Sequence, residues 1–120
     1  MKGENLIEDR CFDFAVRIIN LYKHLQSKHH ENNLSKQVLR SGTSIGANVK
    51  EATHAQSRKD FISKMNIALK ESYETEYWLQ LLNRTDYITD TEFKSIFTEN
   101  QDITNIIAKI VITSKNNQEE

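Results

Sequence analysis

Apolar residues recur every three or four positions along most of the chain, the spacing that places them on one face of an α-helix. The first run predicts a helix over about residues 5–27, and a second run predicts one over about 34–56. The polar, turn-like segment SKHHENN separates them. The first helix presents its apolar face through Cys11, Phe14, Ala15, Ile18, Tyr22 and Leu25.

Two further helices are predicted over about residues 58–83 and 90–114, and each starts at a capping box. Ser57 with Asp60 opens one, and Thr89 with Glu92 opens the other. The helix after Ser57 has one long apolar face and a second apolar set on a different face, formed by Ile67, Trp78 and Leu81. A helix that is apolar on two faces needs two partners, so it is central in the fold or packs against another subunit. The terminal SKNNQEE is expected to fray.

Four amphipathic helices joined by short loops predict an all-α fold, an antiparallel up-down-up-down four-helix bundle, with residues 1–120 as a single domain. The chain has no proline and three glycines in 120 residues, which agrees with helix throughout. No apolar window is long enough to span a membrane, and the charged start lacks the apolar core of a signal peptide. With Cys11 as the single cysteine, we expect a soluble cytoplasmic protein.

The segment RSGTSIGANVKEA, residues 40–52, holds two of the three glycines and raises the question of a phosphate-binding loop. It lacks the G-x-x-x-x-G-K-[ST] and G-x-G-x-x-G patterns, and apolar positions continue at helical spacing through both glycines. The segment is therefore predicted to be helical. Gly42 and Gly46 then form a smooth seam where a neighbouring helix can approach closely, which must offset about 1 kcal/mol of helix propensity per glycine.

Polar residues line the other flank of the same helix as a ladder, through Gln37, Arg40, Ser44, Asn48 and Glu51. Glu76 falls within the apolar face of the next helix, where a carboxylate needs a cationic partner, and Arg40 is the candidate. This set is open to three interpretations: a catalytic constellation, a ligand site, or a structural polar network. The network is favoured, because Ser44 has no histidine or lysine three or four residues away to act as a base.

Metal and cofactor sites are not expected. His29 and His30 are adjacent in a polar loop, and the other two histidines stand alone without the spacing of a metal site. The net charge of −1 excludes a strongly basic nucleic-acid-binding protein. Charge is uneven, however: residues 1–60 carry 10 Lys/Arg against 7 Asp/Glu, and residues 61–120 carry 6 against 10.

The most specific sequence features are R-S-G-x-S-I-x-A-N-x-x-E-A, then S-x-x-D-F and A-x-x-E-x-x-E-T-x-Y-W-L. With FAVRIINLYKHL before them, they resemble the family of 23S rRNA-intervening sequence proteins from about residue 5 to 112. The resemblance implies an antiparallel four-helix bundle that assembles into a homo-oligomer, a five-fold ring, with no assigned enzymatic activity. A related branch resembles the accessory variability determinant of diversity-generating retroelements, whose strongly basic members bind nucleic acid and a reverse transcriptase.

The chain departs from that branch in charge, since its isoelectric point is about 6.4. Our leading hypothesis is therefore a non-enzymatic, homo-oligomeric interaction module. The alternative is an RNA- or DNA-binding protein that uses a basic cluster between the second and third helices, which a ring would repeat as a rim. That cluster consists of Lys50, Arg58, Lys59 and Lys64.

Overall fold

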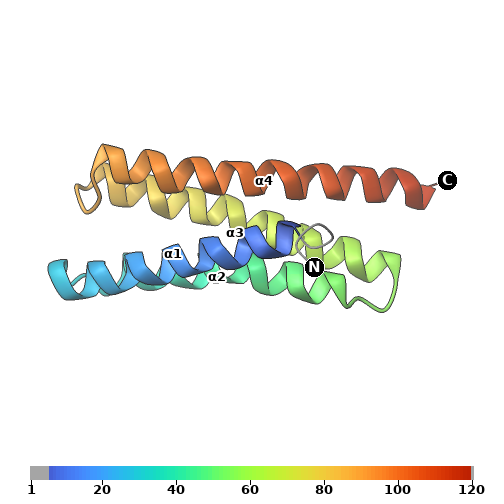
Figure 1. Ribbon diagram of the computed structural model, residues 1–120, viewed down its shortest axis with the longest axis horizontal. Helices are drawn as coiled ribbons and strands as arrows, with labels where there is room; N and C mark the ends of the chain where they lie inside the picture. The colour runs from blue at the N-terminus through green and yellow to red at the C-terminus, as the bar shows by residue number, and fades with distance from the viewer. Residues whose placement is uncertain (1–5, 120) are drawn as a thin grey trace.

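The computed structural model describes residues 6–119, and these residues form four α-helices joined by short loops (Figure 1). The helices are α1 (Leu6–His29), α2 (Leu34–Thr53), α3 (Arg58–Arg84) and α4 (Asp90–Glu119). The all-helical prediction is confirmed. Three ends differ from the sequence-based bounds: α1 continues to His29, α2 stops at Thr53, and α4 continues through most of the segment expected to fray.

Successive helices run antiparallel, so the chain goes up and down the long axis of a molecule measuring 51 × 25 × 21 Å (Figure 1). Within the described residues, α1 packs on α2, α2 on α3, and α3 on α4. The four-helix bundle is closed by the packing of α1 against α4, and these two helices make the least contact of any packed pair. Helices α1 and α3 are therefore diagonal to each other, and their outer surfaces face away from one another.

The core is formed by the predicted apolar faces. From α1, Phe14, Ile18 and Leu25 are fully buried, and Cys11 is nearly so. Burial of each such side chain contributes about 1.5–3 kcal/mol to folding. Burial also raises the pKa of the Cys11 thiol to about 12. The other three helices contribute Val38, Ile45, Val49, Ala52, Ile62, Met65, Ala68, Leu79, Leu82, Ile96, Ile103, Ile107 and Val111.

Local hydrogen bonds explain where α3 and α4 begin. The Ser57 hydroxyl accepts from the backbone N–H of Asp60 at 3.0 Å. At the next start, the backbone N–H of Thr89 donates to Glu92 at 2.8 Å, and that of Glu92 donates to the Thr89 hydroxyl at 3.1 Å. Hydrogen bonds from the Thr89 backbone and side chain lower the pKa of Glu92. The capping box of Thr89 and Glu92 is thus confirmed, whereas Ser57 makes the N-cap bond alone and the Asp60 carboxylate accepts from the backbone N–H of Gln56.

The start of α2 is capped by a residue that lies before the helix. Asn33 makes no side-chain cap, and Glu31 instead accepts from the backbone N–H groups of Asn33, Leu34 and Ser35 at 3.0, 3.0 and 2.7 Å. Partial burial raises the pKa of Glu31, but these three donors outweigh it and the pKa is lowered. The first turn of α2 therefore depends on an ionised Glu31.

The outward face of α3 keeps the second apolar set that its sequence predicts. Ile67 is exposed, and Trp78 and Leu81 are half-buried. Within the part of the chain described, no helix is long and apolar enough to cross a membrane.

Candidate interaction surfaces

The two glycines of α2 lie where α1 crosses it. A Cβ atom built on Gly42 would lie 2.8 and 2.9 Å from the Cγ1 and Cγ2 atoms of the buried Ile18. A Cβ atom on Gly46 would lie 3.2 Å from the Cβ of Cys11 and 3.5 Å from its main chain. The helix that approaches this seam is therefore α1, and at Gly46 its backbone comes close to that of α2.

Arg40 does not pair with Glu76, which corrects the pairing inferred from the sequence. Its guanidinium contacts Glu71 at 3.4 Å and forms a close ion pair with Glu74. Glu74 also accepts from the indole N–H of Trp78 at 2.9 Å. Glu76 is half-buried and has no ion pair among the described residues. The rotation of α3 about its own axis turns Glu71 and Glu74 towards α2 and leaves Glu76 on another side.

The other members of the polar ladder bond locally and do not complete one network. The Ser44 hydroxyl donates to the carbonyl of Arg40 at 2.6 Å, and the Asn48 amide donates to the carbonyl of Ser44 at 2.9 Å. Glu51 pairs with Lys64 of α3 at 3.1 Å, and this contact raises the pKa of Lys64. The ladder is thus a set of separate bonds that tie α2 to itself and to α3.

The four cations of the predicted basic cluster have different surroundings. Lys50 pairs with Glu8 of α1 at 2.9 Å, which lowers the pKa of Glu8, and Lys64 pairs with Glu51. Arg58 and Lys59, in the first turn of α3, are exposed and have no ion pair among the described residues. Half of the cluster is therefore neutralised by neighbouring carboxylates.

Two buried polar contacts connect α3 to its neighbours. The Thr75 hydroxyl donates to the Ser41 hydroxyl of α2 at 3.0 Å. The amide of Asn100 in α4, fully buried, donates to the carbonyl of Ser72 at 2.9 Å, and its Oδ1 atom has no hydrogen-bond partner in the described part of the chain. Sequence reasoning did not identify Asn100. The signal it missed was an asparagine in register with Ile96, Ile103 and Ile107.

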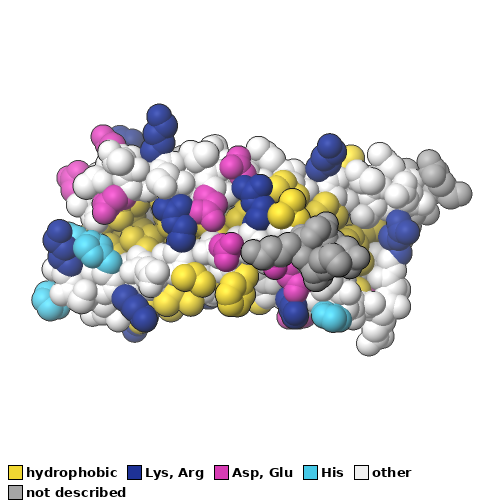
Figure 2. All heavy atoms as spheres, viewed as in Figure 1, with side chains coloured by type: hydrophobic (Ala, Val, Ile, Leu, Met, Phe, Trp, Pro, Cys, Tyr) yellow, Lys and Arg dark blue, Asp and Glu magenta, His cyan; other side chains and the backbone are white. Residues whose placement is uncertain are grey.

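Along the outside of α1, large apolar side chains form a stripe, which we call the α1 stripe. It consists of Phe12, Val16 and Ile19, exposed by 70%, 45% and 38%. They are spaced by four and three residues, so they lie on one side of the helix. Hydrophobic side chains reach the surface along the lower edge of the face in Figure 2, over α1 and α2.

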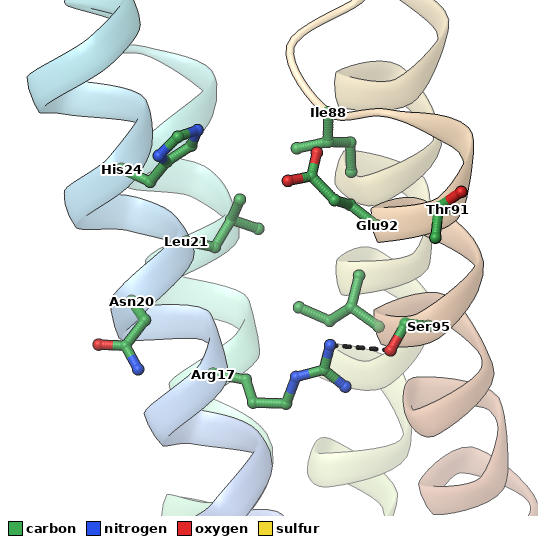
Figure 3. A pocket seen from close by; sticks show the side chains of 9 residues that line it. Arg17, Asn20, Leu21, His24, Ile88, Thr91, Glu92 and Ser95 are labelled. Carbon is green, nitrogen blue, oxygen red and sulfur yellow. Dashed lines mark hydrogen bonds between the residues drawn. The ribbon is translucent and has the colours of Figure 1, made fainter.

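Between α1 and α4 lies an open cleft of about 480 Å³ (Figure 3). Its apolar lining comes from Leu21, Ile88 and Ile96. At one end Arg17 reaches across from α1, donating to the Ser95 hydroxyl at 3.0 Å and to Glu99 at 2.5 Å. These bonds link the two helices that otherwise touch least, so Arg17 and Ser95 help to hold the bundle closed. Within the described residues, no group of three or more His, Cys, Asp or Glu is arranged to hold a metal ion.

Comparisons with known proteins agree on the family. The family model described as 23S rRNA-intervening sequence protein matches residues 4–109. A crystal structure of a protein of unknown function from the S23 ribosomal protein family of Bacteroides thetaiotaomicron is 55% identical to this chain, with a TM-score of 0.87. The match covers 88% of this chain and 97% of that one. No curated protein matches the sequence.

Proposed function

Since the chain belongs to the family of 23S rRNA-intervening sequence proteins, we propose that it is a non-enzymatic interaction module that assembles into a homo-oligomeric ring. The resemblance of its sequence to that family implies five copies. The observation that carries the proposal is the α1 stripe, a line of large apolar side chains left exposed on a bundle whose core is already complete.

The energetics of association require a second surface. Burial of the three stripe side chains contributes at most about 1.5–3 kcal/mol each, while association costs about 4–15 kcal/mol in lost rigid-body freedom. The stripe alone roughly balances that cost. A stable assembly therefore needs further apolar area, which the outer face of α3 offers through Ile67, Trp78 and Leu81.

The positions of these two surfaces favour a ring. Because α1 and α3 are diagonal in the bundle, their apolar surfaces lie on different sides of the same molecule. The α1 stripe of one copy then packs on α3 of the next. Contacts between unlike surfaces join copies head to tail, and they close into a ring when the rotation between neighbours allows it.

The experiment replaces the α1 stripe with polar residues and measures mass by sedimentation. The triple variant Phe12→Gln/Val16→Gln/Ile19→Gln is expected to sediment as a helical monomer of about the 14.0 kDa of one chain. The matched control is Ile112→Gln, which removes an exposed apolar side chain from α4 and should leave the assembled mass unchanged. An unchanged mass in the triple variant would contradict the proposed interface.

A second candidate function is nucleic-acid binding, and it is favoured by the exposed Arg58 and Lys59, which have no ion pair within residues 6–119. With Lys50 and Lys64 held by carboxylates, the basic rim expected from the sequence is reduced to these two residues. The test is a binding titration with RNA and DNA at low and moderate salt. Binding to phosphates must weaken as salt rises, and no binding at low salt would remove this candidate.

A further inference from the structure

The exposed side chains of α3 include four cations and no carboxylate. The helix as a whole carries both signs, with Asp60, Glu71, Glu74 and Glu76 among its residues. Its exposed residues are Arg58, Lys59, Ser63, Ile67, Lys70, Tyr73, Tyr77, Gln80 and Arg84. The four carboxylates of α3 are therefore less exposed to solvent than its four exposed cations.

The hydrogen bonds of the acidic residues explain this difference in exposure. Glu71 and Glu74 turn towards α2, where both contact Arg40. Asp60 accepts from the backbone N–H of Gln56 at the helix start, and Glu76 is half-buried. The outer surface of α3 is consequently positive although the protein carries a net charge of −1.

Two tyrosines lie among these cations. Tyr73 and Tyr77 are 54% and 55% exposed and one helical turn apart. The Tyr77 ring packs against Trp78 with centroids 5.1 Å apart and planes at 68°, which restrains it. Rings held at a surface among cations are suited to stacking with nucleic-acid bases, a contact available to every base because each has a π-face.

The cations and the tyrosines share one stripe along the helix, which we call the α3 track. Lys59, Lys70, Tyr73, Tyr77 and Arg84 are separated by 11, 3, 4 and 7 residues, and these spacings keep them on one side of an α-helix. At about 1.5 Å per residue, the track extends over roughly 38 Å. Its two tyrosines lie between flanking cations, so a strand laid along it meets positive charge on both sides of the stacking rings.

We infer that the α3 track binds single-stranded nucleic acid, with Lys59, Lys70 and Arg84 contacting phosphates and Tyr73 and Tyr77 stacking on bases. A duplex fits less well, because its bases are already stacked on one another and cannot reach the tyrosines. Two α3 tracks facing each other would repel, which disfavours a second copy paired through this surface. The inference rests on the second candidate function above, and it competes with the packing of an α1 stripe on α3, because Leu81 lies within four residues of Tyr77 and Arg84 on the same side of the helix.

The test is fluorescence anisotropy of the full chain with end-labelled 12-mers of uridylate and deoxyuridylate, which differ only in the sugar, and with a 12-base-pair DNA duplex. Both single strands should bind at low salt and more tightly than the duplex. A preference between them identifies whether the sugar is ribose or deoxyribose. Replacement of both tyrosines, Tyr73→Leu/Tyr77→Leu, should weaken binding by about tenfold or more, since stacking on even one base contributes at least about fivefold. Tyr73→Phe/Tyr77→Phe keeps the rings and should retain the affinity.

Charge variants separate specific phosphate contacts from general attraction. Lys70→Gln/Arg84→Gln should weaken binding and reduce the slope of log K against log salt by about 1.4, or about 0.7 for each lost phosphate contact. The matched control is Lys94→Gln/Lys109→Gln, which removes two exposed lysines from α4 and should leave the affinity nearly unchanged.

Four results would overturn the inference: no binding of either strand at low salt, equal loss in the α4 control, equal affinity of the leucine and phenylalanine pairs, or duplex binding as tight as single-strand binding. Sedimentation of the leucine pair completes the test. An unchanged mass supports the assignment, whereas a change of mass would mean that the tyrosines form a protein interface. Failure of the α1 stripe variant to alter the mass would refute the proposed assembly and leave these binding data intact.

Discussion

Replacement of Gly42 by alanine tests how closely α1 packs on α2. The new methyl group would lie 2.8 and 2.9 Å from two carbon atoms of Ile18, and 3.1 Å from a third. Ile18 is fully buried and branched at Cβ, so it has little freedom to move away. The substitution therefore sets a gain in helix propensity against a steric overlap in the core.

The magnitudes decide the sign. Alanine in place of glycine favours the helix by about 0.8–1.0 kcal/mol. Overpacking of a well-packed core costs about 1–3 kcal/mol. The net effect of Gly42→Ala is a loss of about 0–2 kcal/mol in the free energy of unfolding. In an Ile18→Ala background, which itself costs about 2–5 kcal/mol, the overlap is gone and the same change should stabilise by about 1 kcal/mol.

The assay is urea denaturation of the four proteins of this cycle, followed by helical circular dichroism at one fixed protein concentration, because assembly makes stability concentration-dependent. The expected coupling between the two sites is about 1–3 kcal/mol, with opposite signs of the Gly42→Ala effect in the two backgrounds. If Gly42→Ala stabilises both backgrounds equally, α1 does not press on this glycine and the reasoning is wrong.

Three further predictions concern buried or capping groups. Glu31→Gln should lower the free energy of unfolding by about 1 kcal/mol at neutral pH. Because the pKa of Glu31 is lowered in the fold, its contribution to stability is complete above the ordinary glutamate pKa and is lost as pH falls through the lowered value. The stabilities of the two proteins should therefore converge in acid, and a difference that persists there would contradict the cap. Asn100→Leu should raise the free energy of unfolding in urea by about 1 kcal/mol, because it removes a buried oxygen without a partner among the described residues. A loss above about 2 kcal/mol would show that the hydrogen bond to Ser72 contributes more than the unpaired oxygen costs. Cys11 should resist a thiol reagent at neutral pH until urea unfolds the chain, since burial raises its pKa to about 12, and rapid labelling of the native protein would mean that the bundle opens at α1.

Helix number, helix starts and most of the core were predictable from sequence, because they depend on contacts close along the chain. Apolar spacing selects the face that each helix buries, and a capping box involves residues three apart. In the structure Thr89 and Glu92 make two reciprocal cap bonds, and Ser57 makes one cap bond with Asp60. The glycine segment was likewise assigned to a helix because its apolar period continues through Gly42 and Gly46.

Pairings between helices were less predictable, because periodicity does not set the rotation and axial position of one helix against another. Arg40 was matched with Glu76 on the basis of charge and burial, whereas the rotation of α3 presents Glu71 and Glu74 instead. For the same reason, the carboxylates that neutralise Lys50 and Lys64 could not be foreseen. Their partners, Glu8 and Glu51, lie 42 and 13 residues away in sequence.

Exposed apolar residues are difficult to predict for a different reason: the sequence does not distinguish a side chain that faces the core from one that faces a neighbouring copy. Phe12 is followed two residues later by Phe14, and only the structure shows that Phe14 is buried while Phe12 is 70% exposed. The second apolar face of α3 was visible in the sequence, and its partner is what the proposed assembly supplies.

Sedimentation velocity of the unmodified protein at micromolar concentration tests the central claim most directly. Assembly through the α1 stripe predicts a single species whose mass is a multiple of 14.0 kDa, with five copies for the ring implied by the family resemblance. A folded, fully helical monomer of 14.0 kDa under the same conditions would contradict the account.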